Sequence, residues 1–95
     1  MSLFRRQARA QTQRQAEREA ERRRSRIAKR RAEIEAEIEK KETERAALAT
    51  EMNDPNFYLA RKDADEMIAR YESLGSAIDQ LYAALVKFDE TDSVA

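Results

Sequence analysis

The side chains that could do chemistry are carboxylates and guanidinium groups, because the chain contains no His and no Cys. Two short acidic groups have the residue types of a general acid/base pair or a metal site. They are Asp63, Asp65 and Glu66, and Asp89, Glu90 and Asp92. The start of a helix explains the first group and a solvated tail explains the second, and neither explanation requires an active-site cleft. The chain also lacks the loop Gly-x-x-x-x-Gly-Lys-Ser/Thr that binds nucleotides. We therefore predict that it is not an enzyme, with no catalytic or metal site and no cofactor.

Arginines are concentrated in the first third of the chain, where they could bind phosphate groups. Residues 1–31 hold twelve basic and three acidic residues, a net charge of +9, whereas residues 51–95 have a net charge of −6. The planar guanidinium group suits phosphate oxygens, and cations on all sides of a helix can follow a nucleic-acid backbone. The predicted nucleic-acid-binding residues are Arg14, Arg18, Arg22, Arg23, Arg24, Arg26, Lys29, Arg30 and Arg31.

No residue pattern in this basic arm indicates base recognition, so phosphate contacts with weak sequence selectivity are expected. DNA and RNA both stay open as ligands. The alternative is that the arm is only a solubilising linker from a preceding domain. Membrane-surface binding is disfavoured because residues 5–24 hold no large apolar side chain, and an interfacial helix needs an apolar face.

The composition predicts that helices carry these side chains. Of the 95 residues 40% are charged, one is Gly and one is Pro, which is typical of coiled coils and long helices. With a mean hydropathy of -0.92 the chain has too little apolar material for a compact globular core. No alternating run of β-branched residues predicts a strand. No apolar run has signal-peptide or membrane length, so a cytoplasmic location without membrane contact is expected.

Two series of positions at alternating steps of three and four residues predict helix packing. The first seam comprises Ile27, Arg31, Ile34, Ile38, Lys41, Arg45, Leu48 and Met52. The second seam comprises Ala64, Met67, Tyr71, Leu74, Ile78, Leu81, Leu85 and Phe88. Long cations occupy three places of the first seam, and their methylene stems can cover apolar surface while the charges reach water. If the helices are antiparallel, each such cation faces a large apolar residue, as Arg45 would face Tyr71.

Asn53-Asp54-Pro55 predicts the break between the helices, because the residue before a proline is pushed out of the helical region. Phe57 and Tyr58 should cover the hairpin end. Asp63 should cap the second helix through its carboxylate. Gly75 is expected at an exposed place beside the second seam.

The predicted fold is all-α: a two-helix antiparallel coiled-coil hairpin with a basic N-terminal extension that is helical or disordered. Residues 1–26 form the basic arm, and residues 27–92 form the hairpin. The hairpin consists of a helix at 27–52, a turn at 53–62 and a helix at 63–90. A monomer is expected, with a dimer as the alternative, because a parallel homodimer would leave Pro55 in mid-helix.

Four stretches in order carry a resemblance to a known family. They are a basic lead-in at residues 22–30, a Glu-rich helix at residues 34–39, the break Asn-Asp-Pro-Asn-Phe-Tyr at residues 53–58, and the return at residues 69–85. Over roughly residues 15–90 the chain resembles the C-terminal coiled-coil domain of the ABC-F class of ATP-binding cassette proteins. The Asp-Pro-x-Phe-Tyr turn between two heptad helices is the most specific part.

Members of that class are soluble proteins with two tandem ATPase domains that act on the ribosome in translation, and in some the C-terminal hairpin is reported to bind DNA. The resemblance implies an accessory module of a larger ATPase, with DNA or ribosomal RNA and the upstream ATPase domains of the parent chain as partners. The chain departs from the family at Leu85-Val86-Lys87-Phe88, where many relatives have an Arg-Trp pair, and it contains no ATPase domain. A purely structural spacer or dimerisation element is the alternative function.

Overall fold

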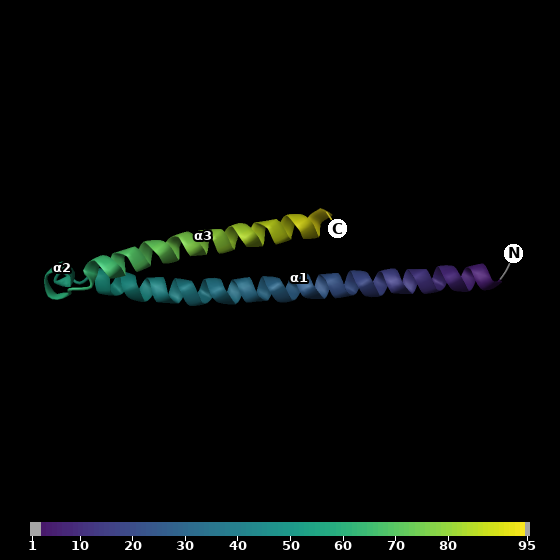
Figure 1. The fold of residues 1–95 in the computed structure, drawn as a ribbon, viewed down its shortest axis with the longest axis horizontal. Coiled ribbons are helices and arrows are strands. Elements are labelled where there is room, and N and C mark those ends of the chain that lie inside the picture. Colours follow the sequence, from purple (N-terminus) through teal and green to yellow (C-terminus); the bar gives the residue numbers. More distant parts are fainter. Residues whose placement is uncertain (1–2, 95) are drawn as a thin grey trace. The chain divides into compact units, whose positions relative to one another are not determined.

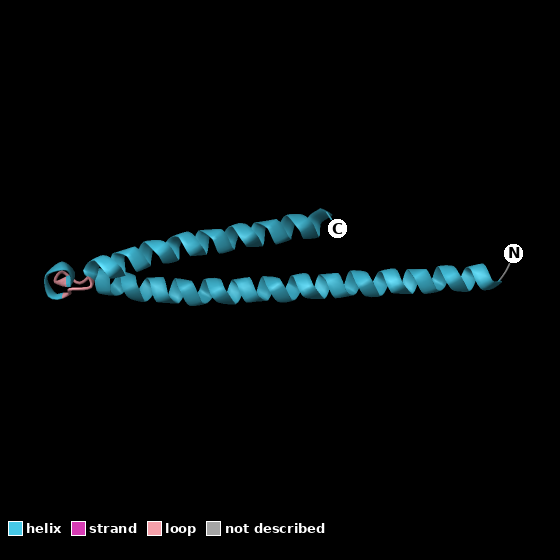
Figure 2. Cartoon of the chain, in the orientation of Figure 1, coloured by secondary structure: helices cyan, strands magenta, loops and turns pink. Residues whose placement is uncertain are grey.

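The computed structural model describes residues 3–94, apart from the side chains of residues 60 and 91–94. The elements are α1 (Leu3–Met52), α2 (Phe57–Ala60) and α3 (Ala64–Val94), and residues 3–94 include no strand (Figures 1 and 2). The predicted all-α class is confirmed. The chain divides into two units, residues 1–30 and residues 31–95, and we describe each by itself.

The second unit is a two-helix hairpin in which residues 31–52 of α1 pack against α3 (Figure 1). From Arg31 to Met52 every position of the first seam is buried or half-buried, and every other position except Ala49 is exposed. All eight positions of the second seam are likewise buried or half-buried. The deepest are Leu74, at 1% exposure, and Ile34, at 2%. The heptad spacing therefore identified the packed face of both helices.

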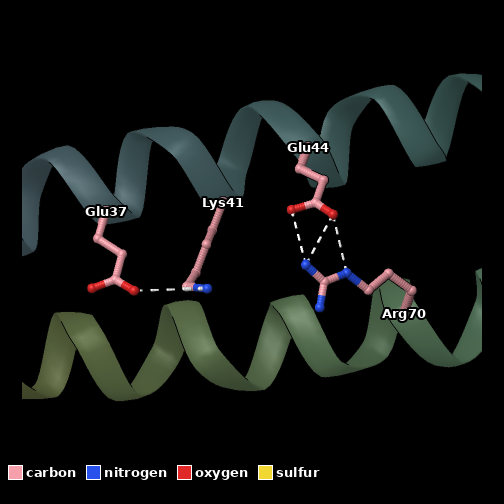
Figure 3. A network of polar contacts seen from close by, with 4 residues as sticks. All are labelled: Glu37, Lys41, Glu44 and Arg70. Carbon is pink, nitrogen blue, oxygen red and sulfur yellow. Dashed lines mark hydrogen bonds and ion pairs between the residues drawn. The ribbon is translucent and has the colours of Figure 1, made fainter.

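Polar contacts between exposed residues of α1 and α3 lie at the edges of this packed face. The guanidinium group of Arg70 donates two hydrogen bonds to Glu44, at 3.0 and 3.1 Å (Figure 3). The hydroxyl of Tyr82 donates to Glu42 at 2.7 Å. Exposed pairs of this kind each contribute about 1 kcal/mol or less, so burial of the seams supplies most of the stability.

Arg45 occupies a seam position and lies against Tyr71, the residue expected to face it. Its Cζ lies 4.1 Å from the centre of the Tyr71 ring, and its Nε donates to the Tyr71 carbonyl oxygen at 3.3 Å. Gly75, one turn further along α3, is buried rather than exposed as expected. A Cβ at Gly75 would lie 2.6 Å from Nη2 of Arg45, so the missing side chain leaves the space that this guanidinium group fills. The expectation of an exposed Gly75 was wrong because it ignored the length of the opposing Arg45.

The turn is held by a short helix and by one buried aromatic ring. The Asn56 amide donates to Oδ1 of Asp54 at 2.9 Å, which stabilises the turn around Pro55. Phe57 is 2% exposed and packs with Ala64 and Met67, so its predicted burial is confirmed. Tyr58 is 68% exposed, and its predicted burial was wrong. Neighbouring residues of a helix point about 100° apart, so a narrow hairpin end cannot cover both rings.

The residues before α3 use their charges differently from the prediction. The carboxylate of Asp63 accepts hydrogen bonds from Arg61 at 3.1 and 3.4 Å, and within residues 3–94 it caps no following amide. Arg61 also pairs with Glu51, at the end of α1, at 3.3 Å. The hydrogen bonds from Arg61 lower the pKa of Asp63 below its ordinary value of 3.8. Arg61 therefore joins Asp63, the residue before α3, to the end of α1.

Candidate nucleic-acid interface

The first unit carries most of the predicted phosphate-binding residues. Residues 3–30 are the first part of α1, and Ala, Arg, Gln and Glu, which favour helix, make up most of them. They contain no Gly or Pro. Only Ala20 and Ile27 are even half-buried, so the segment presents side chains to solvent on nearly every side. Its helical form resolves the alternative left open between a helical and a disordered arm.

Seven of the nine predicted residues lie exposed and without a charge partner among the described residues. They are Arg14, Arg18, Arg22, Arg23, Arg24, Arg26 and Lys29. Eleven basic and three acidic residues give residues 1–30 a net charge of +8. Because so many cations have no carboxylate to neutralise them, they are available to an anion from outside this unit.

The cations follow a winding stripe. Arg14, Arg18, Arg22 and Arg26 succeed one another at steps of four, each turned about 40° from the last. A helix rises about 1.5 Å per residue, so the stripe from Arg14 to Arg26 is about 18 Å long. Arg22, Arg23 and Arg26 line an open hollow together with Glu19 and two alanines, Ala16 and Ala20. The alanines let a bulky group approach the guanidinium groups closely.

The two remaining predicted residues are already engaged. Arg30 has an interaction within the described part of the chain. Arg31 forms ion pairs with Asp89 of α3 and, at 3.4 Å, with Glu35. The hydrogen bond to Asp89 raises the pKa of Arg31 above its ordinary value. Arg31 thus stands at a seam position of the hairpin, where its charge is already neutralised.

The acidic groups considered for catalysis form no candidate metal site within the described residues. No group of three or more acidic side chains in the described part of the chain could hold a metal ion. The side chain of Asp92 lies outside that part. Among the same residues, no helix is both long and apolar enough to cross a membrane.

The structure also brings together residues that sequence reasoning missed. An open groove along the hairpin, which we call the acidic groove, is lined by Glu35, Ile38, Glu39 and Glu42 of α1 and by Tyr82 and Leu85 of α3. The spacing of its three glutamates, four and then three residues, was the signal in the sequence. Their carboxylates lie on the rim beside Ile38, a buried residue of the first seam.

The chain was compared with families, curated proteins and solved structures. No family model matches it, and no curated protein or solved structure matches it either.

Proposed function

We propose that the chain is an accessory nucleic-acid-binding module in which a coiled-coil hairpin carries a basic helical arm that binds phosphate backbone. The observation that supports this proposal most is the set of seven exposed cations, from Arg14 to Lys29, that have no partner among the described residues. Such cations bind a polyanion by releasing its counterions, without regard to base sequence. The absence of large apolar side chains from residues 5–24 argues against membrane insertion as their use.

We further propose that the hairpin is an antiparallel coiled coil. Four cross-hairpin pairs support an antiparallel arrangement. The later a residue lies in α1, the earlier its partner lies in the chain segment that contains α3, and the partner of the last one lies just before α3. The pairs are Arg31 with Asp89, Glu42 with Tyr82, Glu44 with Arg70, and Glu51 with Arg61. The buried Phe57 at the turn gives the Asp-Pro-x-Phe-Tyr sequence a structural role, since its ring fills the closed end of the hairpin.

The resemblance to the ABC-F class suggests the setting of this module. In that setting the parent chain supplies upstream ATPase domains, the protein works in the cytoplasm in translation, and the ligand is DNA or ribosomal RNA. The hairpin provides the folded support, and the arm provides the charge.

The salt dependence of binding to duplex DNA and to a structured RNA, measured by fluorescence anisotropy, tests the proposal. If five or six cations contact phosphates of duplex DNA, affinity should fall about 500- to 2000-fold between about 50 and 200 mM salt. Changing Arg22, Arg23, Arg24 and Arg26 to Gln should flatten this dependence and weaken all sequences alike. Hairpin melting should stay nearly unchanged, because these residues lie outside the hairpin contacts.

A matched pair of double variants separates charge position from charge count. Arg22→Gln with Arg26→Gln should reduce the logarithmic salt slope by about 1.8, whereas Lys40→Gln with Lys62→Gln, two exposed cations of the hairpin, should leave it unchanged. If both double variants reduced the salt slope by the same amount, an interface on the arm would be contradicted. No binding of either nucleic acid at about 50 mM salt would leave the spacer function instead.

A further inference from the structure

The acidic groove combines negative charge with partly exposed apolar side chains. Beside its three glutamates, the ring of Tyr82 is 48% exposed and Leu85 is half-buried, whereas Ile38, also in the lining, is buried at 5% exposure. An apolar strip bordered by carboxylates suits a helix that has cations and small apolar residues side by side.

The carboxylates of the groove are only partly satisfied within the hairpin. Glu35 pairs with Arg31 at 3.4 Å, and Glu42 accepts the hydrogen bond from Tyr82. Glu39 is exposed and has no charge partner among the described residues. Residues 31–95 hold eight basic and sixteen acidic residues, a net charge of −8, so the surroundings of the groove add to its negative potential.

The basic arm has the complementary pattern. Arg22, Arg26 and Lys29 repeat the steps of four and three residues that separate Glu35, Glu39 and Glu42. Ala16 and Ala20 lie beside Arg22 and Arg26 in the hollow of the arm, where their small side chains leave room for a ring such as that of Tyr82. The net charges also match, at +8 for residues 1–30 and −8 for residues 31–95.

We propose that the acidic groove binds the basic arm of a second copy of this chain. Each copy offers one arm and one groove, so two copies can close as a dimer with two equivalent contacts. Exposed ion pairs dominate these contacts, so association should be weak and strongly weakened by salt.

The dimer would regulate the nucleic-acid binding proposed above, and this consequence rests on that proposal. Arg22 and Arg26 serve both contacts, so the groove of a partner and a phosphate backbone compete for the same arm. Self-association in the absence of nucleic acid tests the dimer alone, and its outcome is independent of whether the arm binds nucleic acid.

The experiment is sedimentation velocity of the full chain over a range of concentrations at about 50 and 300 mM salt, a range over which the Debye length falls from about 14 to about 6 Å. The parent should dimerise reversibly at low salt, become monomeric at high salt, and keep its helical circular dichroism in both. A groove variant with Glu35, Glu39 and Glu42 changed to Gln should be monomeric throughout. A control with Glu72→Gln, Asp79→Asn and Glu90→Gln loses the same charge from exposed positions outside the groove and should still dimerise.

Mixing two variants gives the decisive result. The groove variant retains its arm, and the Arg22, Arg23, Arg24 and Arg26 to Gln variant retains its groove. Each should be monomeric alone, and an equimolar mixture at low salt should form a heterodimer with one remaining contact. A mixture that stays monomeric while the parent dimerises would place the interface elsewhere. A parent that is monomeric at low salt would overturn the proposal. An arm that bound the groove of its own chain would also give a monomer, and that result would overturn the proposal too.

Discussion

Replacing Gly75 with Ala tests whether the missing side chain at this position makes room for the guanidinium group of Arg45. A Gly in the middle of a helix costs about 1 kcal/mol relative to Ala, so the substitution alone should stabilise α3 by that amount. The new Cβ, however, would lie 2.6 Å from Nη2 and 2.9 Å from Cζ of Arg45. Those distances are too short for contact between non-bonded atoms, so the guanidinium group must move.

The cost of that movement follows from the contacts that Arg45 makes. Loss of the stacking on the Tyr71 ring costs about 0.5–1 kcal/mol, and loss of the hydrogen bond to the Tyr71 carbonyl costs about 1 kcal/mol. The loss of about 1.5–2 kcal/mol exceeds the gain in helix propensity of about 1 kcal/mol. We therefore expect Gly75→Ala to destabilise the hairpin by about 0.5–1 kcal/mol.

A double-mutant cycle with Arg45→Ala, followed by urea unfolding and circular dichroism, measures the coupling. Without the guanidinium group, Gly75→Ala should stabilise by about 1 kcal/mol, so its effect reverses sign and the coupling energy is about 1.5–2 kcal/mol. Ala83→Gly, at an exposed position of α3, calibrates the helix propensity and should cost about 1 kcal/mol in either background. If Gly75→Ala stabilises equally with and without the Arg45 side chain, the reasoning that Arg45 needs the space at Gly75 is refuted.

Three further predictions concern the turn and the boundary of the arm. Phe57→Ala should cost about 3 kcal/mol because its ring is buried, whereas Tyr58→Ala should cost about 1 kcal/mol or less, since only its edge-on contact with the Phe57 ring is lost; equal losses in thermal unfolding would refute the assigned burial. The lowered pKa of Asp63 means that its stabilising effect is complete above its ordinary value of 3.8 and is lost as the pH falls through the lower folded-state value. Asp63→Asn should therefore be less stable than the parent at neutral pH, and the difference should vanish in acid; a constant difference would contradict this role. Arg31→Gln should lower hairpin stability without changing the salt slope of nucleic-acid binding. A flatter slope would show that Arg31 contacts the nucleic acid after all.

Much of the fold could be predicted from the sequence because the determining signals are local. A helix places residues three and four apart on one face, so the spacing alone identified the buried side of both long helices. Pro55 pushes the residue before it out of the helical region, which located the break after Met52. The exposure of the seven arm cations was predictable for the same reason, since a segment without large apolar residues has no face to bury.

The tertiary structure decided which side chains meet across the hairpin, because that depends on the register of the two helices and on the reach of each side chain. The space beside Gly75 is explained only by Arg45 on the other helix, and Arg61 pairs both with Glu51 at the end of α1 and with Asp63, the residue before α3. The acidic groove likewise joins glutamates of α1 to Tyr82, some forty residues later in the chain. A periodic pattern describes one helix at a time, and these three features exist only where two helices are brought together.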